Sequence, residues 1–387
     1  MRIGLILHRS PAYSETFLTH LVGVWEQLGH EVIFIVGWEG RLPSVNYCPA
    51  LPLTLSSYKA RQYVLRVVLG RWWKSPAAKR LYQWERSQGA SRLRAWKRVY
   101  FNLHLAHLQV DWLHFGFMSA ALQREGLGYA LQVPLSASMR GADIALLPLQ
   151  LENPYLRLWP QLNRLHTLGE ELKNLAIQQG IPDTLPVHLI PPMVANPLPA
   201  LRTPRNLSDG PLRILWIGRL TWKKNPELAL QVFHELVKHG ATISATLIGE
   251  GELRGEVEAR IKGLGLSEKV VLRGKVSHQE VLATYAQHDV LLHTAWQEGF
   301  GNVLLEAQAA GLWVVSTPAE GIRENMVDGV TGELLSDWQV EPMVKAITNY
   351  AQKSTAEQAE HAQSGRVRVQ QLFSQEIHLE TWQSFFS

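Results

Sequence analysis

Two kinds of hydrophobic pattern alternate along most of the chain. Short apolar runs are typical of strands buried in a parallel sheet, and the stretches that follow them have apolar residues three and four apart, as helices do. The first example is an apolar run at 3–7, a helical pattern at about 14–28 and a second run at 31–36. Parallel strands need such crossover connections, so the pattern predicts an α/β fold.

The alternation is interrupted at 58–108 and is most regular after residue 211. Further strands are expected at 110–115, 133–138, 212–217, 243–248, 270–273, 290–293 and 313–316. Helices are expected at 117–125, 226–238, 252–262, 278–287 and 301–310, and the helical pattern at 355–386 is continuous. Six prolines between Pro191 and Pro211 can neither continue a helix nor donate to a sheet. They predict a linker between two domains, with a ligand-binding cleft between them.

The composition adds three constraints. Hydrophobic residues make up 46% of the 387 residues and charged residues 19%, which excludes a disordered or collagen-like chain. Cys48 is the only cysteine, so no internal disulfide can form, as suits a reducing compartment. No apolar run approaches the roughly 20 residues that span a bilayer, and the first 15 residues do not predict a signal peptide.

Charge is divided unevenly between the two halves. Residues 1–205 carry 22 Lys and Arg against 12 Asp and Glu, a net charge of +10, whereas residues 206–387 carry 16 against 22, a net charge of −6. Twelve of the cations lie between Lys59 and Arg98, with Glu85 as the only acid and four tryptophans interleaved. This basic insert at 58–108 suits an anionic membrane surface, or else a solvated helical insert packed by its tryptophans.

The strongest local signal is EGFGNVLLE at 298–306, which follows an expected strand and opens a helix. Glycines at 299 and 301 leave backbone N–H groups unobstructed at a helix N-terminus, where an anion is favoured. Glu298 and Glu306 flank this loop, and carboxylates suit hydroxyl groups rather than phosphates. A ligand with both a diphosphate and sugar hydroxyls fits the pattern. The alternative is a glycine-rich turn with Glu306 on a solvated helix face.

A basic loop, GRLTWKKNP at 218–226, follows the first strand of the second domain. Arg219 and Lys224 are expected at the carboxyl end of that strand, where a guanidinium and an ammonium suit a diphosphate. A solvated basic loop is the alternative. The turn GEG at 249–251 is a weaker sign of a close approach between backbone and ligand.

Together these residues resemble the family-4 retaining glycosyltransferases (glycosyl transferases group 1) of the GT-B fold. The resemblance covers most of the chain and includes five ordered motifs, at 218–224, 249–251, 270–281, 298–306 and 320–334. It implies two Rossmann-like domains facing each other across a cleft. The expected parts are an acceptor-binding domain at 1–195, a linker at 196–210, a donor-binding domain at 211–365 and a C-terminal helix at 366–387 that returns to the first domain.

The resemblance also implies roles for individual residues. Arg219 and Lys224 correspond to the residues that hold the donor diphosphate. Glu298 corresponds to the residue that binds the transferred sugar, and Glu306 to the one that binds the ribose diol. The backbone of Lys275 and Val276 matches a segment that contacts the nucleobase. The remaining donor-binding positions lie in the glycine-rich loops: Gly218, Gly249, Gly299, Phe300, Gly301 and Asn302.

The amino-terminal half is similar to a subgroup that builds exopolysaccharides and lipopolysaccharides, such as the colanic acid transferases. The segment YSETFL at 13–18 resembles that subgroup's S-E-T-F-I loop, so Ser14, Glu15 and Thr16 are expected beside the donor in place of a Gly-Gly pair. The segment DWLHFG at 111–116 resembles a shortened D-x-x-H-x-H-F-G motif. His114 is therefore a candidate on the acceptor side, or else a satisfied core histidine.

One position departs from the family. The segment SMRGADI at 138–144 aligns with F-H-G-x-D, whose histidine lies beside the reacting sugar, but this chain has Arg140 there. Arginine stays charged near pH 7 and cannot relay a proton, so Arg140 is expected to contact the donor phosphate or the acceptor. Asp143 is a candidate acceptor-side carboxylate, or else a helix cap or turn residue.

The sequence thus predicts a retaining hexosyltransferase that moves a sugar from a nucleotide-diphosphate sugar to a lipid-linked or polysaccharide acceptor. No Asp-x-Asp pair occurs, so neither a metal nor another cofactor is expected. The predicted location is the cytoplasm, with a peripheral position at the inner face of the cytoplasmic membrane if the insert binds lipid. Two alternatives are open: a soluble transferase for a small sugar or sugar phosphate, and a non-catalytic nucleotide-sugar or nucleic-acid binding protein. No recognised nucleic-acid motif is present.

Overall fold

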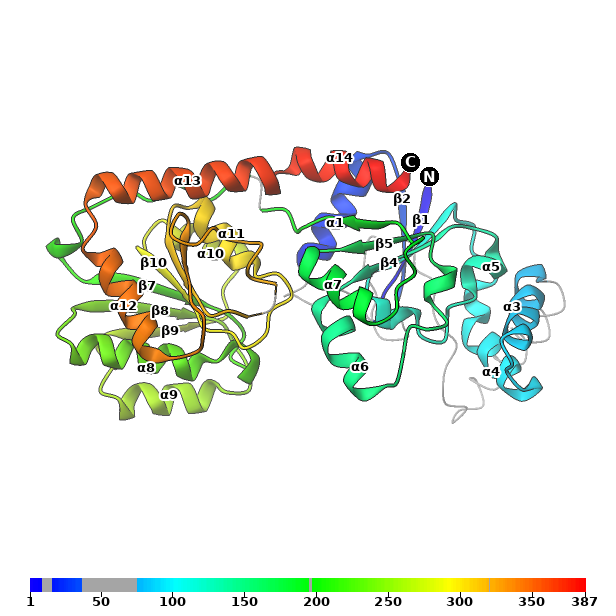
Figure 1. The fold of residues 1–387 in the computed structure, drawn as a ribbon, viewed down its shortest axis with the longest axis horizontal. Helices are drawn as coiled ribbons and strands as arrows, with labels where there is room; N and C mark the ends of the chain where they lie inside the picture. The colour runs from blue at the N-terminus through cyan, green and yellow to red at the C-terminus, as the bar shows by residue number, and fades with distance from the viewer. Residues whose placement is uncertain (9–15, 37–74, 195–196, 320) are drawn as a thin grey trace. The chain divides into compact units, whose positions relative to one another are not determined.

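The computed structural model describes residues 1–8, 16–36, 75–194, 197–319 and 321–387, and only the backbone of Thr16. The chain forms two compact units. The first contains Met1–Ile190 and His378–Ser387, and the second contains Pro191–Ile377. In the described residues each unit is built on a six-stranded parallel sheet with helices on its faces (Figure 1). None of the described helices is long and apolar enough to cross a membrane.

The first sheet has the strand order β2-β1-β3-β4-β5-β6. Its strands are β1 (Arg2–Ile6), β2 (Glu31–Ile35), β3 (Trp112–Phe115), β4 (Leu135–Met139), β5 (Arg164–Thr167) and β6 (Val187–Leu189). The helices are α1 (Thr16–Gln27), α3 (Pro76–Ser87), α4 (Arg92–Asn102), α5 (Leu127–Leu131), α6 (Leu147–Gln150), α7 (Glu170–Gln178) and α14 (Gln375–Phe386). The strand order changes direction between β1 and β3, which is where ligands bind in open parallel sheets.

The last helix, α14, completes the core of the first unit, as the sequence predicts. The Trp382 ring lies 5.1 Å from the ring of Trp25 on α1 and 4.8 Å from that of His166 on β5. The Phe386 ring lies 5.5 Å from the ring of Trp112 on β3. These aromatic side chains of α14 are buried, so the helix is part of the hydrophobic core of the first unit.

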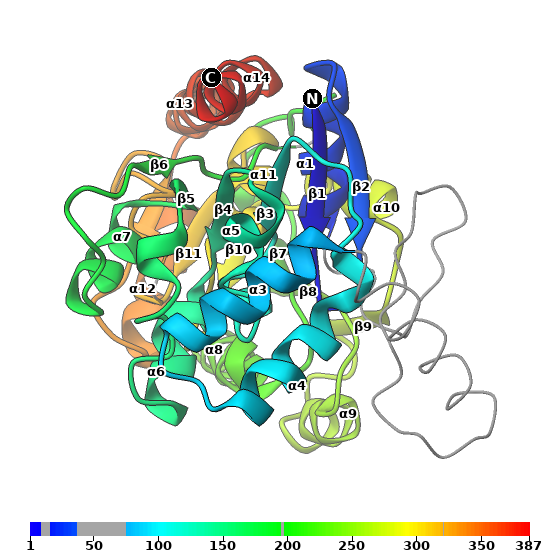
Figure 2. The same ribbon diagram turned by 90° about the vertical axis from the view of Figure 1, so that its right-hand side faces the viewer.

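The described part of the basic insert forms two helices, α3 and α4, which lie side by side in the first unit (Figure 2). Residues 58–74 lie outside the described residues. Ser75 and Ser91 cap the two helices, because their hydroxyls accept the N–H groups of Ala78 and Arg94. Glu85, the only acid of the segment, is buried and paired with Arg157 at 2.9 Å. The exposed surface of this pair is therefore dominated by cations.

The second sheet has the strand order β12-β11-β10-β7-β8-β9. Its strands are β7 (Leu212–Ile217), β8 (Ile243–Ile248), β9 (Val270–Gly274), β10 (Val290–His293), β11 (Trp313–Ser316) and β12 (Gly332–Leu334). The helices are α8 (Pro226–Lys238), α9 (Arg254–Gly263), α10 (His278–Tyr285), α11 (Asn302–Ala309), α12 (Val340–Ala351) and α13 (Thr355–Phe373).

Successive residues of β7 face opposite sides of this sheet, as a strand requires. Ile214 and Trp216 belong to a core cluster that includes residues of α8, α9 and α12. Leu215 belongs to the cluster on the other face, which includes residues of α10 and α11. Covering both faces explains why the strands appear in the sequence as continuous apolar runs.

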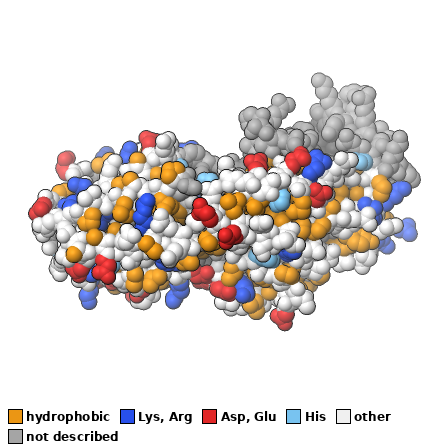
Figure 3. All heavy atoms as spheres, turned by 90° about the horizontal axis from the view of Figure 1, so that it is seen from above, with side chains coloured by type: hydrophobic (Ala, Val, Ile, Leu, Met, Phe, Trp, Pro, Cys, Tyr) orange, Lys and Arg blue, Asp and Glu red, His pale blue; other side chains and the backbone are white. Residues whose placement is uncertain are grey.

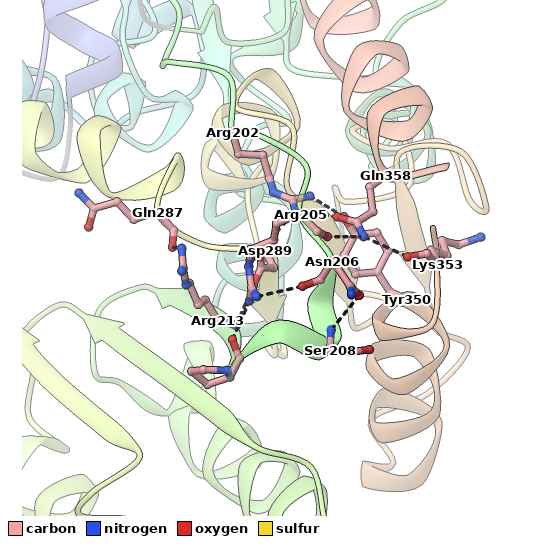
Figure 4. Close-up of polar contacts among 11 residues, drawn as sticks. Arg202, Arg205, Asn206, Ser208, Arg213, Gln287, Asp289, Tyr350, Lys353 and Gln358 are labelled. Carbon is pink, nitrogen blue, oxygen red and sulfur yellow. Dashed lines mark hydrogen bonds and ion pairs between the residues drawn. The ribbon is translucent and has the colours of Figure 1, made fainter. Parts of the chain in front are cut away.

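The end of the predicted linker and the start of β7 are both held by Asp289, just before β10 (Figure 4). Its buried carboxylate accepts hydrogen bonds from Arg202 Nη2 at 3.2 Å, from Arg205 Nη2 at 2.6 Å and from the N–H of Arg213 at 2.9 Å. Arg202 also donates to the hydroxyl of Tyr350 at 2.7 Å. A buried carboxylate with this many charged donors holds the segment in one conformation.

Two predicted elements differ in the structure. The prediction of a helix at 117–125 is wrong: only a 3₁₀ turn, Met118–Ala121, forms, because the backbone is extended at Leu122 and left-handed at Gln123. The helix expected to be continuous at 355–386 is interrupted at Ser374, whose backbone is extended. The pattern also gave no indication of β5, β6, β12, α7 and α12.

Lys and Arg side chains are interspersed with Asp and Glu side chains on the face of the described residues that Figure 3 shows. The difference in net charge between the two halves therefore does not form a single-sign patch on that face.

Candidate active site

The candidate site of the second unit lies at the carboxyl ends of β7 and β10. These strands are neighbours in the sheet, while β8 pairs with the other edge of β7, so the strand order changes direction here. The chain connections leave such a point on opposite faces of the sheet, which opens a crevice for ligands. The loops after the two strands, 218–225 and 294–301, carry most of the predicted donor-binding residues.

The loop that carries Lys224 is held against the loop after β10. The hydroxyl of Thr294 donates to the carbonyl oxygens of Lys224 at 3.0 Å and of Asn225 at 2.9 Å. The N–H of Trp296 donates to the carbonyl of Lys223 at 2.8 Å. Asn225 adopts a left-handed conformation and its side chain caps α8. The backbone around Lys224 is thus fixed independently of any ligand.

Lys224 and Glu298 form an ion pair across the two loops. The Nε2 atom of His293 lies 3.2 Å from the same Glu298 oxygen, and its Nδ1 atom lies 2.9 Å from Oγ of Ser316. Burial and the charge of Lys224 lower the pKa of His293 to about 3, so the neutral ring can donate one N–H to Glu298. The carboxylate is oriented from two sides.

The charge state of Lys224 is finely balanced. Burial, together with the neighbouring cations Arg219 and Lys223, lowers the pKa of Lys224 to about 7. The ion pair with Glu298 acts in the opposite direction and favours the ammonium. Arg219 is itself exposed, two residues beyond the end of β7. This part of the crevice therefore holds more positive charge than the single carboxylate neutralises, as a diphosphate site requires.

Glu306 lies on α11, and residues of α10 hold its carboxylate. The hydroxyl of Tyr285 donates to Oε2 at 2.7 Å, and Nε2 of His278 lies 2.9 Å from Oε1. The hydrogen bond and the charge of Glu306 raise the pKa of His278, and burial, with Glu306, raises that of Tyr285. Each carboxylate oxygen retains a lone pair that can accept a hydroxyl group of a ligand.

The two glycines of the loop before α11 differ in whether a larger side chain could replace them. Gly301 has φ +74°, and a Cβ there would lie 2.8 Å from Cδ1 of Ile322. Gly299 is not in the left-handed region, and a Cβ there would meet no atom within 4 Å. Glycine is therefore required by the fold at position 301, whereas at 299 it leaves open space beside the helix N-terminus. Phe300 between them is buried, and Asn302 is the first residue of α11.

The other predicted donor-binding positions lie at the same edge of the sheet. Gly249 follows β8, and a Cβ there would collide with the carbonyl oxygen of Gly218 after β7. The two loops can thus touch only because position 249 is glycine. Lys275 and Val276 follow β9 at its carboxyl end. The structure brings the loops after four neighbouring strands to one edge.

His114 on β3 belongs to the core of the first unit. The ring is buried, and its Nδ1 and Nε2 atoms each lie 2.8 Å from a serine hydroxyl, those of Ser136 and Ser138. Burial and the charge of Arg140 lower the pKa of His114 to about 3. These contacts favour the core interpretation, and the acceptor-side role of His114 stays a prediction.

The other candidates of the first unit lie after β4 or near α1. Asp143 is buried and accepts backbone N–H groups of Met118, Ser119 and Arg140, which is the role of a turn residue. Burial raises the pKa of Asp143. Arg140 follows β4 directly. Ser14 and Glu15 lie outside the described residues, and so does the side chain of Thr16.

Most of the second unit matches the model of a known protein family. Residues 199–366 match the family Glycosyl transferases group 1. The fold matches solved structures over the full chain at low identity. The Anabaena protein HepE in complex with UDP and glucose has a TM-score of 0.71 at 16% identity and covers 100% of both chains. A sucrose-phosphate synthase from Thermosynechococcus elongatus has a TM-score of 0.70, also at 16% identity, and covers 100% of this chain and 98% of that chain. The predicted GT-B type of fold is confirmed.

Two of the relatives in sequence are named for polysaccharide biosynthesis. The Vi polysaccharide biosynthesis protein VipC/TviE of Salmonella typhi is 32% identical over 145 residues, 38% of this chain and 25% of that protein. The amylovoran biosynthesis glycosyltransferase AmsK of Erwinia amylovora is 27% identical over 274 residues, 68% of this chain and 66% of that protein. The chain thus spans less than two thirds of the length of either relative. The family match and the relatives' names support the predicted class, a glycosyltransferase.

Three residues that contact the predicted carboxylates were not singled out from the sequence: His278, Tyr285 and His293. His293 is the last residue of β10, and a polar residue at the carboxyl end of a buried strand was the available signal. His278 and Tyr285 are seven residues apart on α10 and therefore share one face of that helix. No local pattern shows that this face meets Glu306.

Proposed function

We propose that the protein is a retaining glycosyltransferase that moves a sugar from a nucleotide-diphosphate sugar to a hydroxyl of a lipid-linked or polysaccharide acceptor. The observation that carries the proposal is the ion pair of Lys224 with Glu298 beside the N-terminus of α11, within the family-matched domain. A cation, a carboxylate and free backbone N–H groups meet there, and a sugar diphosphate needs all three.

Departure of the nucleoside diphosphate is the step that needs help, because negative charge develops on its oxygens. Arg219, Lys224 and the N–H groups at 299–302 stabilise that charge. Before the donor arrives, Lys224 and Glu298 neutralise each other. The diphosphate replaces Glu298 as the partner of Lys224, and Glu298 then accepts a hydroxyl of the transferred sugar. Glu306, held by Tyr285 and His278, accepts the ribose hydroxyls.

The chain offers cations and a helix terminus for the diphosphate and has no Asp-x-Asp pair to hold a divalent metal. The acceptor hydroxyl attacks from the same face that the leaving group departs from, which gives retention. Lys275 and Val276 contact the nucleobase. The solved structure with UDP and glucose makes UDP-sugars the first donors to test.

The acceptor class is supported by two relatives that are named for polysaccharide biosynthesis. Helix α4 supports a position at an anionic membrane. It carries four cations and no acid, and Leu93 is 67% exposed and Trp96 42% exposed. Apolar and aromatic side chains among cations suit the headgroup region of the inner face of the cytoplasmic membrane.

The experiment is a hydrolysis and binding screen of the purified protein with UDP-, GDP- and ADP-sugars. We expect one base to be preferred and slow release of free sugar, whose first-formed anomer by NMR has the donor's configuration. Glu306→Gln should lower donor affinity by about 10-fold. Glu256→Gln, on the exposed surface of α9, is the matched control. Binding without hydrolysis would favour a non-catalytic protein, and an inverted anomer would exclude retention.

A further inference from the structure

The first unit has its own crevice edge, at the carboxyl ends of β1, β3 and β4. These three strands are neighbours in the sheet, and β1 and β3 flank the point where the strand order changes direction. His8 follows β1, Ser119 follows β3 and Arg140 follows β4. The Nε2 atom of His8 lies 3.0 Å from Oγ of Ser119. Polar residues that follow three neighbouring strands therefore lie at one edge of the sheet.

Arg140 forms no ion pair and donates no side-chain hydrogen bond among the described residues, and the one carboxylate that acts on its charge is that of Asp143. The guanidinium carbon of Arg140 lies 4.2 Å above the ring of Phe17, and its buried Nε has no hydrogen-bond partner among the described residues. Burial lowers the pKa of Arg140 to about 10, so the side chain is still charged at pH 7. A buried guanidinium nitrogen without a hydrogen-bond partner is unfavourable unless a ligand supplies that partner.

The charge of Asp143 acts on Arg140 and favours its charged form, but the Asp143 carboxylate is already hydrogen-bonded to the backbone. It accepts N–H groups of Met118 at 3.3 Å, Ser119 at 3.0 Å and Arg140 at 3.1 Å, all from the backbone. The charge of Arg124 also acts on His8 and, with burial, lowers the pKa of that ring. Two guanidinium groups thus act on this edge against one carboxylate that is already used.

Aromatic rings form the apolar part of the same edge. The rings of Phe17 and Phe117 meet edge to face at 6.2 Å, and the ring of His8 lies 6.5 Å from that of Phe117. An apolar wall with a few fixed polar groups is the usual composition of a small-molecule site. Planar guanidinium groups bind carboxylates and phosphates through paired hydrogen bonds.

We propose that this edge binds a negatively charged group of the acceptor, a carboxylate or a phosphate, through Arg140, with Phe17 and His8 beside it. The proposal rests on the proposed function, since it assigns the acceptor to the first unit. The donor diphosphate has its own cations in the second unit, Arg219 and Lys224. The acceptor class is therefore an acidic sugar or a sugar phosphate rather than a neutral sugar.

Calorimetry on the purified full chain tests this with glucuronic acid, glucose 6-phosphate and glucose. We expect at least one charged sugar to bind about 10- to 100-fold more tightly than glucose, and the better of the two identifies a carboxylate or a phosphate. Arg140→Gln should remove that difference, and Arg140→Lys should retain part of it. The affinity for UDP, measured in parallel, should not change in either variant.

The matched control is Arg2→Gln, at the amino end of β1, where Arg2 forms an exposed ion pair with Glu31. It should bind the charged sugars like the wild type. The thermal midpoint of Arg140→Gln should not fall, because Arg140 donates no side-chain hydrogen bond to the described residues. The proposal is wrong if the wild type binds the charged sugars no more tightly than glucose. It is also wrong if Arg140→Gln loses UDP affinity instead, or loses stability with unchanged sugar binding. If the wild type binds the charged sugars as expected but does not bind UDP, the proposed function is contradicted and this proposal is not.

Discussion

The hydroxyl of Tyr285 donates a hydrogen bond to Oε2 of Glu306 at 2.7 Å, and both side chains are buried. The two residues lie on different helices, α10 and α11, so this contact fixes the carboxylate relative to the crevice. Tyr285 touches no ligand in the proposed function and is a positioning residue.

We expect Tyr285→Phe to weaken nucleotide-sugar binding by about 5-fold, because Glu306 loses one of its two orienting donors, worth about 1 kcal/mol. Titration of the preferred donor measures this. Tyr350→Phe is the control, since the Tyr350 hydroxyl is equally buried in the second unit but accepts from Arg202 instead. It should lower the free energy of unfolding by about 1 kcal/mol and leave donor affinity unchanged. Equal donor affinities in Tyr285→Phe and wild type would contradict the positioning role.

Lys224 predicts an unusual pH dependence of donor binding. If the diphosphate binds the ammonium, a pKa of about 7 makes donor affinity constant below pH 7 and weaker above it, by up to about 10-fold per pH unit. Stability should change in the opposite direction. The pKa of Lys224 is about 7 in the folded state and 10.5 in the unfolded chain, so between these pH values the folded state binds fewer protons. Lys224 therefore increases the free energy of unfolding as the pH rises.

Binding isotherms at pH 6–9 with the preferred donor measure the affinity, and urea denaturation at the same pH values measures stability. Lys224→Arg should flatten the affinity profile, because arginine stays protonated over this range. The same decline above pH 7 in the arginine variant would show that another group titrates.

The glycines of the loop before α11 allow binding and stability to be separated. Gly301→Ala should lower the free energy of unfolding by about 1–2 kcal/mol, since alanine is strained at φ +74° and its Cβ would meet Ile322. Gly299→Ala should keep the wild-type stability, because its Cβ meets no protein atom. It should nevertheless weaken donor binding by about 10-fold or more, as the methyl group takes the space beside the N–H groups.

Denaturation curves and donor titrations on both variants check this pair. Wild-type donor affinity in Gly299→Ala would remove this loop from the diphosphate site.

Helix α4 is expected to hold the protein on anionic vesicles. Replacing Arg92, Arg94 and Lys97 with glutamine should lower the vesicle-bound fraction steeply, at about 1 kcal/mol for each cation near the surface. Leu93→Ser with Trp96→Ala should lower it further, and 0.5 M salt, about three times the physiological ionic strength, should release the wild type. Co-sedimentation with vesicles that contain phosphatidylserine measures the effect.

The control replaces Arg254, Arg260 and Lys262 on α9 with glutamine. Two of these cations are already paired with acids, Arg254 with Glu258 and Arg260 with Glu227. We expect these variants to sediment like the wild type. If the basic insert has no lipid role, the α4 variants and the α9 variants will have the same vesicle-bound fraction.

The second unit could be predicted from its sequence more fully than the first. The strands β7, β8, β10 and β11 match the expected ranges because both faces of that sheet are covered, which makes each strand a bounded apolar run. β5 and β6 were not predicted, since they are short and carry His166 and His188. His166 is acceptable in the sheet because Ser138 and the carbonyl of Ile190 occupy its nitrogens.

The candidate site was predictable as far as its motifs extend along the chain. Glu298, Glu306 and Lys224 follow from local spacing, because loops after parallel strands meet at one edge. The residues that orient these side chains cannot be predicted from local spacing. Tyr285 reaches Glu306 from another helix, and Asn102 on α4 donates to the carbonyl of Gln123, whose left-handed backbone ends the helix expected at 117–125. Both effects are tertiary contacts, which a local pattern does not contain.

The return of α14 to the first unit has a consequence for how the protein is made. Trp382, Phe385 and Phe386 are core residues of the first unit, yet they are synthesised after the whole of the second unit, Pro191–Ile377. Domains usually fold in the order in which they leave the ribosome. The core of the first unit is therefore incomplete, on the side of its sheet where Trp25 and Trp112 lie, until residues His378–Ser387 have been synthesised. The second unit, although later in sequence, is the first that can close its core.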